Sequence, residues 1–310
     1  MAEGKKDLAH QLAAKSGNAP WLAAALTLSG SELNTLLLGV FRDKAKQLLP
    51  ADILHQFDQN RFTVPSAVDT VALKELELAW LRAAAGRGFE PVTLSPLTPL
   101  GTCSVFGTVD QNKVVSAVRG AEVVSDATNV LALLIAQRYK KTKSESLMKY
   151  AVTHRHVRGQ AFSNPAFSAH FGIFCLVTGG VDTGSFSFEG ATLEEHLVAH
   201  LTLLSAEFGA SRLSTHIYLR DMSGLAPRLN DLVKRLNESG RVDLQEASPA
   251  GGYYAGLQFK IFLEQGKELI NLVDGGTVDW TQHLTGNRKH RALISGSGIE
   301  LVHKIRQGMI

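Results

Sequence analysis

The chain has 310 residues, of which 45% are hydrophobic and 20% charged, and its net charge is +3. This composition excludes a disordered chain, and the length suffices for one large domain or two modest ones. No apolar run approaches the roughly 20 residues that cross a bilayer, which excludes a membrane-spanning chain. Residues 1–6 are polar and lack the apolar core of a signal peptide, so we expect a cytoplasmic protein without a membrane partner.

The first part of the chain is rich in Ala and Leu and is expected to be helical. Turn-forming residues interrupt it at 17–20, at 29–30 and at Pro50. We expect this N-terminal helical segment to cover residues 1–65 and a core domain to cover residues 66–310.

The core is expected to open with a helix that runs from Ser66 to Gly86. Asp69 follows Ser66 at the spacing of a capping box. Leu73, Leu76 and Trp80 share one face of this helix.

Strand-like runs alternate with two amphipathic helices in the rest of the core. Apolar stripes predict helices over residues 192–208 and 225–236. The expected strands are 170–178, 214–219, 253–263, 268–274 and 292–301. Several strands follow one another without an intervening helix, so we expect an α+β domain with a mostly antiparallel sheet flanked by helices.

Several common sites are not expected. Neither glycine-rich phosphate loop is present, and two cysteines, Cys103 and Cys175, predict free buried thiols. His196 and His200 lie four residues apart, as metal ligands on a helix do. Because the order His-Glu-x-x-His is missing, we expect a solvent-exposed helix edge and no metal site. The cationic cluster 154–158 is expected to form a polar strand end.

Two segments carry the first part of a resemblance to a known family. Residues 89–96 lead from the expected helix into a strand, and Asp126 and Thr128 lie at a strand-to-helix turn. These segments resemble the core of class II aminoacyl-tRNA synthetases, in particular the histidyl branch, which includes the regulatory subunit of ATP phosphoribosyltransferase. The resemblance implies that Asp126 and Thr128 hold the α-amino group of a substrate. A carboxylate and a hydroxyl at a helix start suit an ammonium group.

A second block resembles motif 2 of that class, an antiparallel strand pair whose Arg-x-Glu binds the α-phosphate and adenine. Arg158 matches the arginine, and residues 167–171 match the returning strand. Gln160 stands in the place of the glutamate and keeps its hydrogen bonding without its charge. Taken alone, Arg158 could also be interpreted as an ordinary surface arginine.

A third block resembles the Tyr-Tyr strand, the Gly-Gly strand and motif 3 of the histidyl branch. Its residues are Tyr253, Tyr254, Gly256, Gly275, Gly276, Gly296, Gly298 and Glu300. The resemblance implies a ligand site here, because glycines let the backbone approach a flat ligand closely. Sheet packing is the alternative for the two tyrosines. The three blocks together span roughly residues 70–310.

The departures from the family bear on activity. Leu301 stands where motif 3 has an arginine for the ATP phosphates, and an apolar side chain cannot stabilise that charge. Residues 248–252 offer no counterpart of the catalytic arginine that precedes the tyrosine pair. In the histidyl branch, polar residues recognise the substrate imidazole. Their positions would fall near Gly172 and Leu176 in this chain, so the polar side chains are missing. About ten residues follow Glu300, so we expect no anticodon-binding domain and no tRNA partner.

We therefore favour a class II synthetase-like protein that binds an amino acid or a nucleotide-like ligand in a regulatory role, without aminoacylating tRNA. No residue is assigned as catalytic, and a protein partner would carry the catalysis. One alternative is ATP-dependent activation of a carboxylate, with ATP and Mg²⁺ as cofactors and Arg288 or Arg291 as a replacement cation. Another is an interaction module without a ligand. The resemblance also implies a homodimer formed through the helix expected over residues 66–86, which corresponds to motif 1 of the class.

Overall fold

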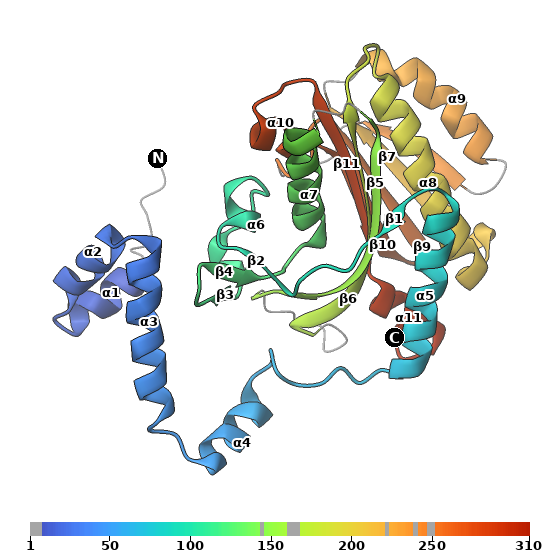
Figure 1. Ribbon diagram of the computed structural model, residues 1–310. Coiled ribbons are helices and arrows are strands. Elements are labelled where there is room, and N and C mark those ends of the chain that lie inside the picture. Colours follow the sequence, from blue (N-terminus) through green and yellow to red (C-terminus); the bar gives the residue numbers. More distant parts are fainter. Residues whose placement is uncertain (1–7, 143–145, 160–167, 221–222, 238–240, 247–251) are drawn as a thin grey trace.

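The computed structural model describes residues 8–142, 146–159, 168–220, 223–237, 241–246 and 252–310. Figure 1 shows an arm of helices beside a core in which helices flank a large sheet. None of the helices in these ranges has the length and apolar character that crossing a membrane requires.

The arm consists of four helices that lie beside the core (Figure 1), and Asn34 of the arm accepts from the N–H groups of Arg119 and Gly120 in the core. They are α1 (Leu8–Lys15), α2 (Ala19–Thr27), α3 (Gly30–Ala45) and α4 (Pro50–Gln59). Each break expected from the sequence therefore separates two helices. A capping box starts α3, because Ser29 Oγ accepts from the Glu32 N–H and the Glu32 carboxylate accepts from the Ser29 N–H. Among the arm's described side chains, Ala25 alone is buried.

The core opens with α5 (Thr70–Gly86). Its N-cap is Asp69, whose carboxylate accepts from the N–H groups of Val71 and Ala72. The expectation that Ser66 caps this helix is wrong, because Ser66 lies in the linker and its hydroxyl binds Glu300 instead. The expected apolar face packs on the sheet of the same chain, and its buried residues are Leu73, Leu76, Trp80 and Ala84.

Eight strands form the main sheet in the order β1-β5-β6-β11-β10-β9-β7-β8. Their bounds are β1 Glu90–Pro91, β5 Met148–Val157, β6 His170–Val181, β7 Leu213–Leu219, β8 Arg241–Glu246, β9 Leu257–Gln265, β10 Glu268–Val278 and β11 His290–Ser297. The β1–β5 and β7–β8 pairs are parallel, and the other five neighbouring pairs are antiparallel. The expected α+β class is confirmed. A small sheet of β2 (Leu97–Pro99), β4 (Ala121–Val123) and β3 (Ser116–Ala117) lies beside it.

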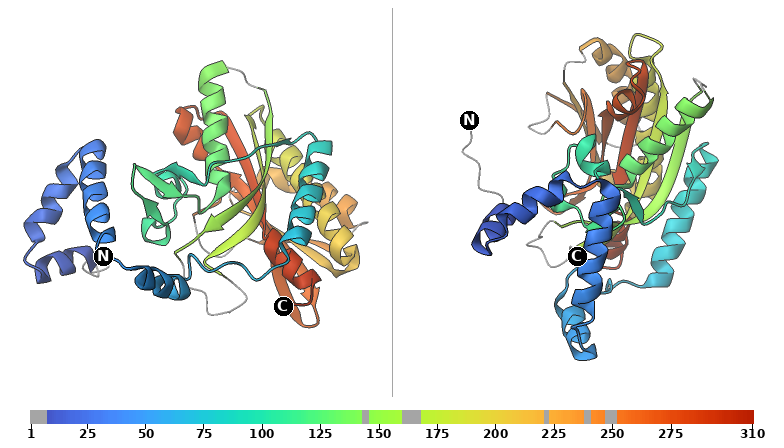
Figure 2. Two further views of the ribbon diagram at one scale, coloured as in Figure 1. Left: turned by 60° about the horizontal axis from the view of Figure 1, so that its bottom comes forward. Right: turned by 60° about the vertical axis from the view of Figure 1, so that its left-hand side comes forward.

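Helices cover both faces of the main sheet, as the two views of Figure 2 also show. One face packs on α5, α8 (Ser187–Phe208), α9 (Ala226–Asn237) and α11 (Ile299–Arg306). The opposite face packs on α7 (Ala127–Thr142) and α10 (Trp280–Thr285), with Phe106 after α6 (Thr102–Val105). Cys103 and Cys175 are buried free thiols, as expected.

The histidine pair on α8 is fully buried, so the expectation of a solvent-exposed helix edge is wrong. His196 Nδ1 and His200 Nε2 each lie 2.8 Å from Ser295 Oγ, and His196 Nε2 lies 2.9 Å from Thr178 Oγ1. Residues 193, 196, 197, 200 and 204 share one helix face, so the histidines face the sheet with the leucines. Burial lowers the pKa of His200 to about 3 and that of His196 well below its ordinary value, which keeps both neutral.

Candidate functional site

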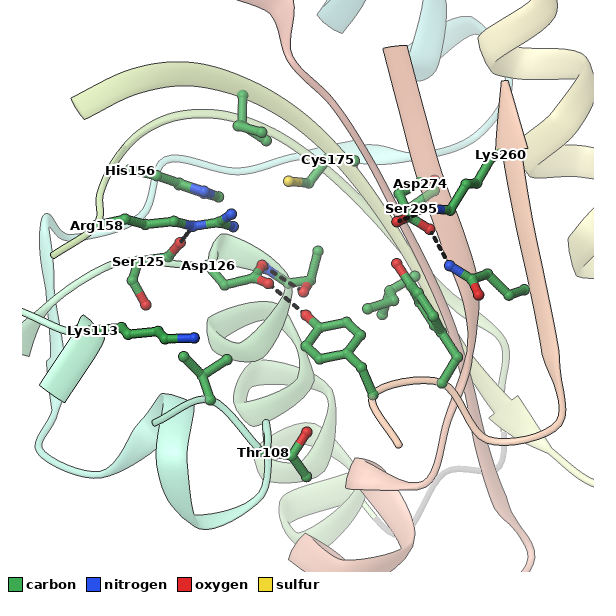
Figure 3. A pocket seen from close by; sticks show the side chains of 18 of the residues that line it. Thr108, Lys113, Ser125, Asp126, His156, Arg158, Cys175, Lys260, Asp274 and Ser295 are labelled. Carbon is green, nitrogen blue, oxygen red and sulfur yellow. Dashed lines mark hydrogen bonds and ion pairs between the residues drawn. The ribbon is translucent and has the colours of Figure 1, made fainter. Parts of the chain in front are cut away.

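A cavity of about 610 Å³ opens on the sheet face that carries α7 (Figure 3). Its walls come from the segment 108–113, the turn before α7, and strands β5, β6, β9, β10 and β11, with Tyr253 and Tyr254 in front of β9. Polar side chains from sequence-distant segments converge on it. Its volume lies within the range of sites that hold small ligands.

The carboxylate of Asp126 is held firmly at one end of this cavity. Its Oδ1 accepts from the Thr128 N–H (2.9 Å) and hydroxyl (2.7 Å) at the start of α7. Its Oδ2 accepts from the hydroxyl of Tyr253, at 2.5 Å and 127 positions away in the sequence. These bonds orient the acid and leave lone-pair capacity for a ligand.

Asp126 stays ionised although it is partly buried. Burial by itself raises the pKa of Asp126, but the neighbouring His156 and Arg158 and the hydrogen bonds from Tyr253 and Thr128 outweigh burial and hold the pKa below its ordinary value. Burial lowers the pKa of His156 to about 3, so this histidine is neutral at pH 7. Its Nε2 accepts from the Ala127 N–H at 2.9 Å. The effective cation beside Asp126 is therefore Arg158.

Arg158 extends from the end of β5 into the cavity (Figure 3). Its Nε donates to the Ser125 carbonyl at 3.0 Å, and its guanidinium lies 5.3 Å from the centroid of the Phe171 ring. These two contacts hold the planar group and leave its terminal N–H groups directed at the space that two cavities share. Such a guanidinium suits a carboxylate or a phosphate.

A second acid lies at the other end of the larger cavity. Asp274 on β10 accepts from Gln258 Nε2 at 2.9 Å, and Lys260 Nζ lies 3.9 Å from its Oδ2. The side chain of Tyr254 also interacts electrostatically with this carboxyl. Burial, outweighing the Gln258 bond and the charge of Lys260, raises the pKa of Asp274. The two neighbouring tyrosines thus interact with two different acidic residues.

A smaller cavity, of about 280 Å³, adjoins the larger one at Arg158, Ile173, Asp274 and Gly296. Phe171 on β6 and Leu301 on α11 contribute apolar surface to it. Lys304, one helical turn after Leu301, also lines it.

Glu300 closes the smaller cavity and has its carboxylate fully engaged. Its Oε1 accepts from Ser66 (2.6 Å) and lies 3.1 Å from Lys304 Nζ. Its Oε2 accepts from Arg155 (2.7 Å) and the Gly172 N–H (3.1 Å). Burial raises the pKa of Glu300, but these partners outweigh it and lower the pKa.

The structure brings most of the expected site residues together. The larger cavity is lined by Asp126, Thr128, Arg158, Tyr253, Tyr254 and Gly296, and the smaller one by Arg158, Gly296, Gly298 and Glu300. Gln160 lies outside the described residues.

Three expected glycines line neither cavity: Gly256, Gly275 and Gly276. A Cβ at Gly275 would meet the Phe259 ring at 2.5 Å, and one at Gly276 would meet the Leu257 carbonyl oxygen at 2.2 Å. The close approach at these positions is therefore made by the protein itself, and Gly276 makes room for the ring of Tyr254.

Sequence reasoning missed several lining residues. His156, expected at a polar strand end, is 1% exposed and lines the larger cavity. Lys113 and the Lys260–Asp274 pair were not singled out. The alternation along β9 was the available signal, because Gln258 and Lys260 had to share the face opposite Phe259.

Two further expectations are corrected. On β6, Gly172 lines the smaller cavity, whereas Leu176 lies in the core on the other face of the sheet and the neighbouring Cys175 lines the larger cavity. Arg291 pairs with Asp182 and Glu189 at the start of β11, away from both cavities. It is therefore not a replacement cation. Within the described residues there is no group of three side chains suited to a metal ion.

No known sequence family and no curated protein sequence matches the chain. Solved structures do match in shape. One is described as an ATP phosphoribosyltransferase regulatory subunit/histidyl-tRNA synthetase from Bacillus halodurans, with a TM-score of 0.61 and 13% identity over 78% of this chain and 81% of that chain. Another is the histidyl-tRNA synthetase of S. aureus, with a TM-score of 0.60 and 11% identity over 79% and 70%.

A histidine–tRNA ligase subunit from Alicyclobacillus acidocaldarius matches with a TM-score of 0.58 and 13% identity, over 79% of this chain and 96% of that one. At such identities the likeness concerns the fold. The antiparallel sheet and these three matches show that the chain has the class II aminoacyl-tRNA synthetase fold, as found in histidyl-tRNA synthetase and in the ATP phosphoribosyltransferase regulatory subunit.

Proposed function

We propose that this chain binds an α-amino acid in the larger cavity in a regulatory role and does not aminoacylate tRNA. The observation that carries the proposal is the partly buried, ionised Asp126 beside the guanidinium of Arg158. An ammonium group would bind the Asp126 carboxylate and the Thr128 hydroxyl. The α-carboxylate would bind the terminal N–H groups of Arg158. One acid and one base in this arrangement complement a zwitterion.

The smaller cavity suits a flat, weakly charged group better than a triphosphate with Mg²⁺. The Phe171 ring offers a stacking surface. Leu301 is apolar, and Glu300 neutralises a nearby cation. Both oxygens of Glu300 are already engaged by protein donors or a protein cation, so they are poor candidates for Mg²⁺. A nucleoside-like ligand fits this chemistry.

One observation favours carboxylate activation as a second candidate function. Lys304 lines the smaller cavity one turn after Leu301, the position where motif 3 has its arginine. Its ammonium is shared with Glu300 at 3.1 Å. Release from that carboxylate would supply the missing cation to an acyl nucleotide.

Isothermal titration calorimetry with a panel of amino acids tests the proposal. Binding is expected for the wild type, and Asp126→Asn should weaken it about 30-fold or more because a charge-assisted bond is lost. Asp279→Asn, at the start of α10 and outside both cavities, is the matched control. ATP–pyrophosphate exchange with any amino acid would establish activation instead. The absence of any binding or thermal shift, with amino acids or ATP, would favour the interaction module.

The regulatory role implies a protein partner that carries catalysis, and the fold class suggests a homodimer. The apolar face of α5 is used within the chain, since Trp80 is 1% exposed. A dimer formed through α5 would use its outer face, where Val71 and Leu78 are 69% and 47% exposed. Light scattering on the wild type and on Leu78→Glu would test this contact.

A further inference from the structure

We propose that the amino acid held in the larger cavity has a neutral side chain that both donates and accepts hydrogen bonds, as a carboxamide does. This side chain would form hydrogen bonds with Asp274, Lys260 and Gln258. This inference rests on the proposed function and names the class of ligand.

These three residues share the face of the sheet that lines the cavity. Lys260 on β9 lies opposite Asp274 on β10 in the strand register, and Gln258 lies two residues earlier on the same face of β9. Figure 3 shows Asp274 and Lys260 across the cavity from Asp126 and Arg158. The site therefore has a zwitterion-binding end and a side-chain end.

Asp274 and Lys260 have unused hydrogen-bonding capacity. Their charged atoms are 3.9 Å apart, which is too long for a hydrogen bond, and their side chains are 39% and 30% exposed. One is an acceptor and the other a donor. A carboxamide, with an NH₂ group and a carbonyl oxygen at one end, would satisfy both.

The tyrosine pair keeps the two ends apart. Tyr253 donates to Asp126, whereas Tyr254 lines the cavity with Asp274 and interacts electrostatically with it. Their rings meet edge to face at 4.9 Å, and Trp280 packs on the Tyr253 ring at 5.4 Å. Neither tyrosine can turn without disturbing the other, so the two acids act on different parts of one ligand.

The charges of the cavity balance without a ligand. The lining acids are Asp110, Asp126 and Asp274, and the lining bases are Lys113, Arg158 and Lys260. An amino acid with a charged side chain would upset this balance. An apolar side chain would cover Asp274 and Lys260 without giving either a partner, at a cost in desolvation.

Calorimetry with four amino acids of similar length tests the inference. Glutamine is expected to bind at least about tenfold more tightly than methionine, glutamate or lysine. A tenfold difference in affinity corresponds to the contribution of one well-formed hydrogen bond to a charged group. Asp274→Asn and Lys260→Met should each weaken glutamine binding about tenfold and leave methionine binding within about threefold. Lys267→Met, on the exposed turn between β9 and β10, makes the same chemical change outside the cavity and is expected to have no effect.

The outcomes separate this inference from the proposed function. Equal affinities across the four amino acids, together with loss of binding in Asp126→Asn, would overturn the side-chain inference and keep the amino-acid site. Tighter binding of lysine, glutamate or methionine would also overturn it. If none of the four binds, the side-chain inference fails, and the wider panel of amino acids decides whether the proposed function fails with it. The comparison among wild-type affinities needs no variant, so a poorly folded mutant cannot obscure it.

Discussion

The hydroxyl of Ser66 donates a 2.6 Å hydrogen bond to Oε1 of Glu300, joining residues 234 positions apart in the sequence. Ser66 belongs to the linker between the arm and the core, and Glu300 begins α11 beside the smaller cavity. The same linker is held at Val64, whose carbonyl oxygen lies 2.6 Å from His170 Nε2. The base of the arm is therefore attached to the strand and the helix that bound the smaller cavity.

Ser66→Ala is expected to lower the free energy of unfolding by about 1–2 kcal/mol, because Glu300 is 1% exposed and would lose a partner. Urea denaturation measures this. Ser31→Ala, on the exposed surface of α3, makes the same change without such a bond and should stay within about 0.5 kcal/mol of the wild type. Equal effects of the two substitutions would contradict the assigned contact.

Gly276 and Gly296 should respond differently to a methyl group. In Gly276→Ala the new Cβ would lie 2.2 Å from the Leu257 carbonyl oxygen, and backbone cannot yield as a side-chain end can. We expect a loss of about 2–3 kcal/mol in the free energy of unfolding. In Gly296→Ala the nearest atom is Cys175 Sγ at 3.6 Å, an ordinary contact, so stability should stay close to that of the wild type. Thermal unfolding of both variants would show whether this order holds.

The buried histidines predict a stability that falls in mild acid. The pKa of His156 and that of His200 are lowered from 6.5 to about 3 in the folded protein. The unfolded chain therefore binds more protons between these values, and stability decreases as pH falls below about 6.5. Each such histidine adds up to about 1.4 kcal/mol per pH unit. Urea denaturation from pH 8 to pH 5 should show this slope of stability against pH. His200→Gln should reduce the slope by the amount that one bound proton contributes. An unchanged slope would mean that His200 is already protonated in the folded state.

Ligand binding is expected to tolerate acid better than stability does. Asp126 has a pKa below its ordinary 3.8, so it remains ionised as long as the pH is above that value. Its contribution to the fold and to ammonium binding is present above this pH and is lost only as the pH falls through the lower folded-state pKa. Amino-acid affinity measured by calorimetry should therefore be constant from pH 8 to pH 6. A loss of affinity within that interval would indicate that another group holds the ammonium.

Local patterns predicted most of the secondary structure. The alternation of Leu257, Phe259 and Ile261 marked β9, and the breaks in the arm were placed by glycine and proline. The start of α5 was misplaced because Ser66 and Asp69 are both residue types that cap helices well. The Ser66 hydroxyl binds the distant Glu300 instead, and Asp69 caps the helix. The α8 histidines were misjudged because their partners, Ser295 and Thr178, come from two strands that the helix sequence does not reveal.

The site was predictable only in part. The resemblance led to Asp126, Thr128 and Tyr253, which the structure brings into contact. Asp274 and Lys260 were not found from the sequence. Their proximity depends on the pairing of β9 with β10, which is set by the turn and by burial of the opposite face.

The sequence by itself determined the helices of the arm, α5, α8, α9, most strands of the main sheet, the α+β class and the acid–threonine pair before α7, but not α10 or α11. These predicted features depend on short-range periodicity and on motif residues close together in the chain. Only the tertiary structure decided which polar side chains meet. Strand register sends Lys260 and Asp274 into the cavity, and helix packing turns His196 and His200 into the core. Such meetings depend on long-range packing, in which a one-residue shift of a strand exchanges its two faces.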